Sequence, residues 1–397
     1  MWPVSDHYLA TLARSHMRLS YIEVLKDGVV VATENAGVVV DPATDLPVSS
    51  IGGSVSVDRS TVRRAMQLQL LDVSGLLLPN DVSDLLAPFT TEIRIWVGLR
   101  YWDAPLPALG PPPTGTGGSP TLQVETEYVP IGTFVVTDVS NHYPQLSLQG
   151  SDRMWVLAGF PSIYQIAAGT NAGDALVTLL GTFVPGSRLA LNIPDTEHTT
   201  PTLSFDVNTS IADAAHTVAQ VAGWQLYCDP MGTFTATDEP STDDDPVLVL
   251  APGAFSVMYR PDHAVGTSGG ELYTAVVFTG EGGTTAPVRG YAEDTDPNSL
   301  TYAARVGVRP YFESSPLVTT QAQADLAART TLRRILGVSD TIAVPIVPNF
   351  ALESGDILHV TDPQQNIDLN LVADSFNLPI RAADGMQTIN CRSRVVR

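Results

Sequence analysis

Two kinds of hydrophobic periodicity alternate along the chain. Most segments carry short runs of alternating apolar and polar residues, as in MQLQLLDV at residues 66–73, which is typical of strands with one buried and one solvated face. Apolar residues three and four positions apart mark residues 5–16, 209–223 and about 320–336, and this spacing predicts amphipathic helices. The pattern therefore predicts a mainly β protein with an α+β insert.

The periodicity changes twice and so divides the chain into three expected parts. β patterns fill residues 1–151 and 241–397, whereas residues 152–240 have the pattern of an α/β module. We expect a β domain at each end and a small α/β module in the middle. Residues 103–127 are rich in Pro, Gly and Thr, which predicts a flexible loop between two strands of the first domain.

Local signals support several of these elements. Ser5 is a candidate N-cap for the first helix, and Thr209 or Ser210 for the second. Asp27-Gly28 is a hairpin turn signal between two strand patterns. In the helix at about 320–336, apolar residues are expected largely on one face; they are Ala324, Leu326, Ala327, Leu332 and Ile335.

The segment PIVPNFALESGDILHV, residues 345–360, follows this last helix and has an unusual combination of features. Pro345 and Pro348 lack a backbone donor, which fits an edge or a crossover better than a central strand. Gly355 suits a turn with positive φ. We therefore expect a proline-containing crossover, a turn at residues 354–356 and a return into a sheet.

Composition restricts the class of partner. Apolar residues make up 44% of the 397 residues, which is enough for packed cores. The 42 acidic residues outnumber the 21 basic ones, giving a net charge of −21. Such a balance disfavours adhesion to nucleic acid or to anionic lipid, because both are polyanions.

Cysteine usage and segment hydropathy add two expectations. Cys228 and Cys391 lie far apart in sequence and in no metal-ligand spacing, so we expect two reduced, buried thiols. The amino-terminal segment lacks the pattern of a signal peptide, and no apolar run is long enough to span a membrane. We expect synthesis in a cytoplasm.

The candidate chemical residues form no recognisable catalytic or metal-binding motif. None of the histidines has a metal-ligand spacing; they are His7, His16, His142, His198, His216, His263 and His359. Gly280-Glu281-Gly282-Gly283 lacks the Lys-Ser/Thr pair of a phosphate-binding loop. We therefore expect no enzyme activity, no catalytic residue, no cofactor and no metal site.

For the acidic clusters and for one aromatic set, a ligand-binding role and a purely structural role have to be compared. Asp243-Asp244-Asp245 and the pair Asp294/Asp296 could ligate calcium, but they lack the spacing of a calcium loop, which favours solvated loops. Trp96, Tyr101 and Trp102 could stack on carbohydrate, whereas packing in a core or an interface is the simpler interpretation.

Two blocks of the sequence resemble the central hub proteins at the tail tip or baseplate of phages, and in particular minor tail proteins of siphophages that infect actinobacteria. The first block contains MWPVSDHYL, DVSGLLLPNDVSDLLAPFTTEIRIWVG and PIGTFVVTDV. The second joins the helix AQADLAARTTLRRIL to the proline crossover; its carriers are Pro348, Phe350, Leu352, Gly355 and Asp356. The resemblance covers most of the chain and is weakest in the middle module and the 103–127 loop.

The resemblance implies a fold, partners and a location. Hub proteins have two tube-type β-barrels, and three copies form a pseudo-sixfold ring that continues the tail tube. The expected partners are two further copies of the chain, a tail-tube or distal tail protein ring above, tip or fibre proteins below, and the tape-measure protein and DNA in the lumen. The helix at 320–336 would pack outside the second barrel. The chain would be a structural virion protein at the tail tip that takes part in DNA ejection.

Two alternatives remain at this point. One is a tail protein that binds a carbohydrate or receptor on the host surface, through the middle module or the 103–127 loop. The other is the hub of a contractile injection particle, which uses the same type of ring.

Overall fold

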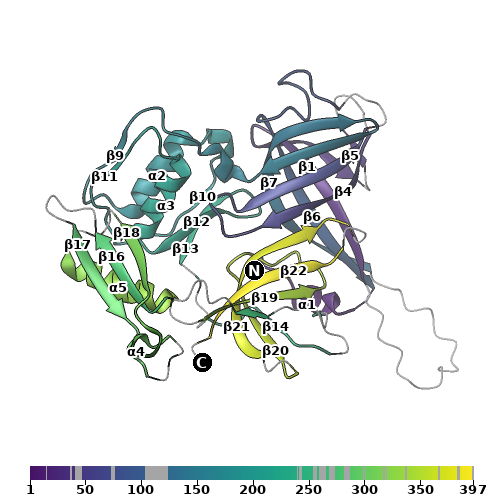
Figure 1. Cartoon of the computed structure of the whole chain (residues 1–397). Helices are drawn as coiled ribbons and strands as arrows, with labels where there is room; N and C mark the ends of the chain where they lie inside the picture. Colours follow the sequence, from purple (N-terminus) through teal and green to yellow (C-terminus); the bar gives the residue numbers. More distant parts are fainter. Residues whose placement is uncertain are drawn as a thin grey trace.

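The chain folds into a mainly β structure with a few short helices, which confirms the expected fold class (Figure 1). The computed structural model describes residues 1–14, 16–35, 38–40, 47–72, 77–102, 124–238, 240, 244–253, 257–258, 265–267, 273–280, 287–297, 299, 301–315, 318, 320–335, 338–364, 367–381 and 385–395. Within these residues, no helix has both the length and the apolar character needed to cross a bilayer.

The amino-terminal part is a closed barrel of eight strands. They are β1 (Met17–Lys26), β2 (Val29–Asn35), β3 (Val38–Val40), β4 (Pro47–Val57), β5 (Arg64–Leu71), β6 (Thr91–Trp102), β7 (Val124–His142) and β8 (Gln145–Ser151). Antiparallel pairings run from β1 through β2, β3, β4, β5, β8, β7 and β6 back to β1. Within the ring each strand pairs with two neighbours, but the β3–β4 ladder is short and leaves Ser54–Val57 of β4 without a partner from β3.

Two predictions made from local sequence signals are confirmed in this part of the structure. Helix α1 (Asp6–Leu12) begins after Ser5, whose side chain accepts a hydrogen bond from the backbone N–H of Tyr8. Asp27 and Gly28 both have positive φ, 49° and 76°, in the hairpin between β1 and β2. The two-residue turn with positive φ matches the twist of the flanking strands. Of the expected 103–127 loop, residues 103–123 lie outside the described residues, and β7 begins at Val124.

The carboxy-terminal strands extend the same sheet. They are β14 (Leu248–Leu250), β15 (Val265–Thr267), β19 (Val338–Ile346), β20 (Ile357–Asp362), β21 (Ile367–Pro379) and β22 (Gln387–Val395). The end of β21 pairs antiparallel with β4, from Phe376–Val57 to Pro379–Ser54, so the two terminal regions share one 14-stranded sheet. They also share one hydrophobic core. In the described strands this second region is an open sheet, and its closure into a barrel stays a prediction.

The middle module has its own hydrophobic core. Its elements are η1 (Arg153–Val156), β9 (Tyr164–Ile166), α2 (Ala172–Phe183), η2 (Gly186–Arg188), β10 (Leu191–Asn192), β11 (Leu203–Phe205), α3 (Ile211–Val221), β12 (Trp224–Cys228) and β13 (Phe234–Asp238). Ser210 caps α3 by accepting from the N–H of Asp213 at 3.0 Å. The helix packs one apolar face on α2 and β12, as its periodicity predicts.

A small unit within the last third of the chain has a third, separate core. It contains β16 (Ala275–Gly280), β17 (Val288–Glu293), α4 (Ala303–Val306), β18 (Pro310–Ser315) and α5 (Gln321–Ile335), which lie together at the side of the molecule in Figure 1. The presence of α5 confirms the predicted helix. It packs on β16 and β17, so the expectation that it covers the outside of a second barrel is wrong.

The buried face of α5 also differs from the expected one. Ala324, Ala328 and Leu332 are buried, whereas Leu326 is 61% exposed. Residues four apart lie on one helix face, and Leu326 lies two positions from both Ala324 and Ala328. The prediction from apolar character alone, which put Leu326 on the buried face of the helix, is therefore wrong. The domain boundaries at residues 151 and 240 stay predictions.

Candidate functional site: a buried charged junction

Arg64, the first residue of β5, connects three parts of the chain. Its side chain is 2% exposed and forms an ion pair with Glu353, and its Nη1 donates to the carbonyl oxygen of Cys228 at 2.6 Å. Its backbone N–H donates to Oδ2 of Asp152 at 2.9 Å. The barrel, the segment around Glu353 and the middle module therefore meet at one guanidinium. We call this set of contacts, with those of Glu92 and Arg153 below, the junction.

Asp152 stands at the start of the middle module and caps its first turn. Its Oδ1 accepts from the backbone N–H of Met154 at 2.9 Å. Burial raises the pKa of the Asp152 carboxyl to about 6, against the lowering effect of its backbone donors and of Arg64. Burial makes the ionised form of this carboxyl costly. The backbone N–H groups of Arg64, in the barrel, and of Met154, in the middle module, donate to it and hold it in place.

Glu92, on β6, binds two arginines of the middle module. Arg153 Nε and Nη2 donate to its two carboxylate oxygens at 2.9 and 2.8 Å, a bidentate arrangement, and Arg188 Nε lies 3.2 Å from Oε1. Arg153 Nη1 also donates to the carbonyl oxygen of Gly232 at 2.9 Å. Glu92 is 2% and Arg153 6% exposed. This paired and hydrogen-bonded geometry fixes the middle module against the barrel.

The segment at residues 345–360 forms the third side of the junction. β19 carries Pro345 into the large sheet, a turn with Gly355 at φ 98° follows, and β20 returns to the sheet. Asp356 accepts from the backbone N–H of Glu353 at 2.7 Å and forms an ion pair with the terminal ammonium of Met1. The predicted crossover and turn are confirmed, and the turn presents Glu353 to Arg64.

The chemistry of the junction is that of a structural contact. Its charged groups are paired with one another or with backbone groups, which stabilises a fixed arrangement. The Cys228 thiol is buried at its edge, and burial raises its pKa well above the usual value. Such a thiol is a poor nucleophile. Cys391 is also buried, and both cysteines are free, as predicted.

The described histidines belong to different elements and loops of the chain. His7 is in α1, His142 ends β7, His198 is in a loop and His216 is in α3, whereas His263 lies outside the described residues. His16 Nδ1 lies 2.9 Å from the carbonyl oxygen of Arg14. His359, on β20, contacts Oδ1 of Asn370 at 2.9 Å and Asp368 at 3.2 Å. In the part of the chain that the structure describes, no three metal-ligating side chains are grouped to hold a metal ion.

The acidic candidates have local structural partners. Asp294 is buried and accepts from Oγ1 of Thr301 at 2.6 Å and from the N–H of Asp296 at 3.0 Å. These bonds organise the loop that precedes α4. Asp244 and Asp245 are in a described loop, whereas Asp243 and residues 281–283 lie outside the described residues.

The aromatic candidates occupy β6. Trp96 stacks on Tyr21 with ring centroids 5.8 Å apart, and its Nε1 donates to Oε2 of Glu23 at 3.0 Å. This favours the packing interpretation for Trp96. Tyr101 and Trp102 are the last two residues of β6, and their side chains lie outside the described part.

No sequence motif marks the four charged residues of the junction, which are Arg64, Glu92, Arg153 and Glu353. A signal was present, because each is a charged residue next to or inside an apolar strand or turn pattern, as in TEIRIWVG. Charged residues are almost never fully buried unless they are paired. The sequence does not show which acid pairs with which base, because Arg64 and Glu353 are 289 positions apart.

Comparison with known proteins gives a result at the level of the fold. No family model matches the chain, and no curated protein matches it in sequence. A tail protein from Neisseria meningitidis MC58 has a similar structure, with a TM-score of 0.59, 14% identity, and coverage of 96% of this chain and 98% of that chain. The 43 kDa tail protein of prophage MuSo2 from Shewanella oneidensis has a TM-score of 0.56, 12% identity, and coverage of 94% and 98%.

A third solved structure extends this result. Prophage tail protein gp18 from Listeria monocytogenes EGD-e has a TM-score of 0.52 and 9% identity, and the similarity covers 95% of both chains. All three similarities extend over nearly the whole chain, including the middle module and the small unit. The chain therefore shares its fold with these three tail proteins, two of which come from prophages.

Proposed function

We propose that this chain is a structural protein of a phage tail, made in the host cytoplasm and incorporated into the virion. One observation carries the proposal: the complete architecture, barrel, middle module, small unit and carboxy-terminal sheet, matches these three tail proteins over 94–96% of the chain. The buried junction supports it, because it joins the parts into a fixed body suited to assembly.

The finer proposal is a trimeric hub at the distal end of the tail tube. Each chain would supply two similar β regions, and three chains would surround a channel with pseudo-sixfold symmetry. The closed barrel β1–β8 and its continuation through β4 and β21 support this arrangement, because two β regions are already joined edge to edge within one chain. The ring would contact the tube or a distal tail protein above and tip or fibre proteins below.

The acid excess has a role in this proposal. With 42 acids against 21 bases, part of the excess would line the channel and repel the phosphates of DNA during ejection, when the tape-measure protein has left the lumen. A neutral or basic lumen in a map of the assembled ring would contradict this role.

Electron cryomicroscopy of assembled particles, without imposed symmetry at the tail tip, tests the proposal. The expected result is three copies of the chain around the tube axis. Copies placed off the axis would reject the hub and favour a host-surface carbohydrate- or receptor-binding role, which glycan binding to host cell walls would then check. A contractile sheath around the same ring would identify the particle as a contractile injection device.

A further inference from the structure

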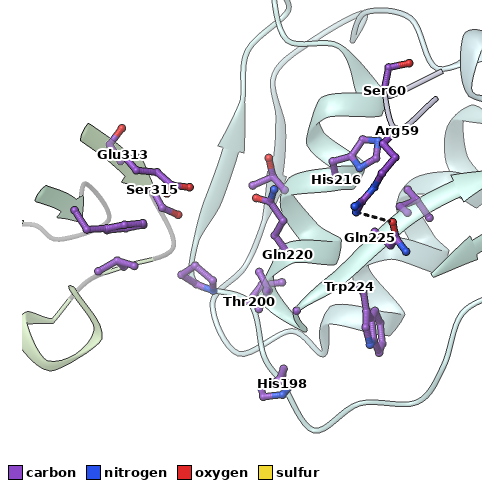
Figure 2. A pocket seen from close by; sticks show the side chains of 18 of the residues that line it. Arg59, Ser60, His198, Thr200, His216, Gln220, Trp224, Gln225, Glu313 and Ser315 are labelled. Carbon is purple, nitrogen blue, oxygen red and sulfur yellow. Dashed lines mark hydrogen bonds between the residues drawn. The ribbon is translucent and has the colours of Figure 1, made fainter. Parts of the chain in front are cut away.

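A large cleft lies where three parts of the chain meet. Its volume is about 1240 Å³. One wall comes from the large sheet, with the loop before β5 and residues of β21 and β22, another from α3 and β12 of the middle module, and a third from β18 of the small unit (Figure 2). We call it the three-part cleft, and its lining includes Arg59, Arg63, His216, Gln220, Glu313 and Arg392.

The lining of this cleft carries more basic than acidic residues, whereas the chain as a whole is acidic. Three arginines, Arg59, Arg63 and Arg392, line it together with two acids, Glu313 and Asp374, whereas acids outnumber bases two to one in the whole sequence. Asp374 Oδ1 lies 2.9 Å from Arg392 Nε and 3.8 Å from Arg59 Nη1, so it pairs with both arginines. Glu313 accepts from Thr331 Oγ1 of α5 at 3.1 Å. The cleft is therefore a locally cationic site on an acidic protein.

Arg63 is a buried arginine in the lining of this cleft. Its side chain is 4% exposed, and it forms no ion pair with a carboxylate of the described residues. Nη2 donates to Oε1 of Gln225 at 3.0 Å, and Nη1 to the carbonyl oxygen of Ser354 at 3.3 Å, while Nε is buried without a hydrogen-bond partner among the described residues. The guanidinium also lies 3.7 Å from the centre of the Tyr227 ring.

Such a guanidinium is costly to bury. Burial, and next the neighbouring charge of Arg64, lower the pKa of Arg63 to about 10. The carboxylate of Glu353, which pairs directly with Arg64, opposes this lowering in part. A buried charge without a direct ion pair is costly unless other groups compensate it. Neutral acceptors and the aromatic face compensate part of this cost, and an anion in the cleft would compensate more.

A second polar atom, in the wall formed by α3, also has no hydrogen-bond partner within the described part of the chain. Nε2 of His216 is buried without a hydrogen bond. Burial lowers the pKa of this imidazole, Asp213 opposes that shift, and the positive charge of Arg63 adds to it. Arg59 Nη2 donates to Oε1 of Gln225 at 3.4 Å, the same atom that accepts from Arg63 Nη2. The two guanidinium groups thus share one acceptor in the lining of the cleft, and the charge of Arg63 acts on His216.

We propose that the three-part cleft binds an anionic group, a carboxylate or a phosphate, through Arg63 and Arg59 with His216 as an additional donor. Guanidinium groups bind both kinds of anion through paired N–H donors. The anion could belong to a free solute or to an acidic side chain of a protein partner. The site is independent of the hub proposal, because it rests on the cleft within one chain.

Isothermal titration calorimetry on the full chain tests the site with two probes. One is inorganic pyrophosphate, and the other is an acetylated tetraglutamate peptide. We expect saturable binding of at least one probe, weakening as salt is added because the contact is electrostatic. Binding of pyrophosphate alone would indicate a solute site, and tighter binding of the peptide would indicate an acidic segment of a partner.

Two variants locate the binding. Gln220→Glu places a negative charge on the exposed cleft surface of α3 without removing a junction contact, and should weaken binding about tenfold, as expected for a nearby like charge. Gln67→Glu adds the same charge on the exposed outer face of β5 and should leave binding unchanged. Arg63→Gln should abolish binding. If this variant fails to fold, the affinity of Gln220→Glu still shows whether the anion binds in the cleft.

Two results would overturn the proposal. One is the absence of saturable heat from either probe at millimolar concentration. The other is equal binding by the chain, by Gln220→Glu and by Gln67→Glu, which would place any anion contact outside the cleft.

Discussion

Glu92 is the carboxylate that pairs with two arginines of the middle module, the buried Arg153 and the partly exposed Arg188. Arg153 binds it with two hydrogen bonds and Arg188 with one ion pair. Removing one partner of a buried pair leaves the other charge uncompensated, and this cost exceeds the value of the pair itself. At the scale of single residues, the stability of the junction therefore depends on matched charges more than on apolar area.

Glu92→Gln keeps the shape of the side chain and removes its charge. We expect a loss of about 3–5 kcal/mol in the free energy of unfolding, because Arg153 would stay buried without a carboxylate. Urea denaturation measures it. Glu197→Gln, at an exposed loop position, is the matched control and should change stability by less than about 0.5 kcal/mol. Equal effects of the two substitutions would contradict the assignment.

Asp152 gives the junction a dependence on pH. Its folded-state pKa of about 6 lies above the ordinary value of 3.8. As pH falls, the folded state takes up a proton before the unfolded state does, so this residue adds stability with acidification. From about pH 7.5 to about pH 5 the gain should be ~1.4 kcal/mol, the free energy of about one pKa unit.

The Asp152→Asn variant isolates this contribution from other titrating groups. The difference in unfolding free energy between the chain and the variant should grow in favour of the chain as pH falls over this range. A difference that stays constant or shrinks would show that Asp152 is ionised in the folded state at pH 5.

At the scale of elements, a glycine sets the distance between α5 and its sheet. A Cβ at Gly290 on β17 would lie 2.0 Å from the carbonyl oxygen of Ala324. The helix backbone therefore rests directly on the strand, and the buried alanines of α5 permit the same close approach. Small residues on both elements explain how a helix with few large apolar groups packs well.

Gly290→Ala should displace α5 and loosen the small unit, because the overlap is with backbone and cannot be relieved by a rotamer change. Hydrogen exchange should show lost protection in α5 and unchanged protection in the barrel. Gly186→Ala is the control, since a Cβ there meets nothing within 4 Å. Unchanged protection of α5 would show that the observed packing is wrong.

At the scale of the whole molecule, the two ends of the chain form one cooperative body. The pairing of β4 with β21 and the shared core connect residues more than 300 positions apart, such as Val57 and Phe376. The small unit has a separate sheet and core. The barrel should therefore respond to changes in the carboxy-terminal strands and not to changes in the small unit.

Phe376→Ala tests this coupling. The residue is 4% exposed in the shared core, and its truncation should cost about 3–5 kcal/mol. Hydrogen exchange should then show faster exchange in β4 and β5 of the barrel. Phe278→Ala, in the core of the small unit, should leave these strands protected. Equal effects on the barrel would mean that the small unit is part of the same cooperative body.

The sequence by itself determined the local features of this protein. Alternating apolar residues specified most strands, Ser5 and Ser210 specified helix starts, and Asp27-Gly28 specified a hairpin, because each signal acts over a few neighbouring residues. The helix starts and the hairpin do not depend on a distant part of the chain. The wide separation of Cys228 and Cys391 in the sequence predicted two reduced thiols.

Only the tertiary structure decided which distant segments meet. The β4–β21 ladder, the seat of α5 on β17, the Arg64–Glu353 pair and the buried guanidinium of Arg63 all join segments far apart in sequence. Periodicity shows that a face is apolar but not what covers it, and composition shows that charges exist but not which ones pair. These choices follow from the packing of the whole chain, where complementary shape and charge select one arrangement.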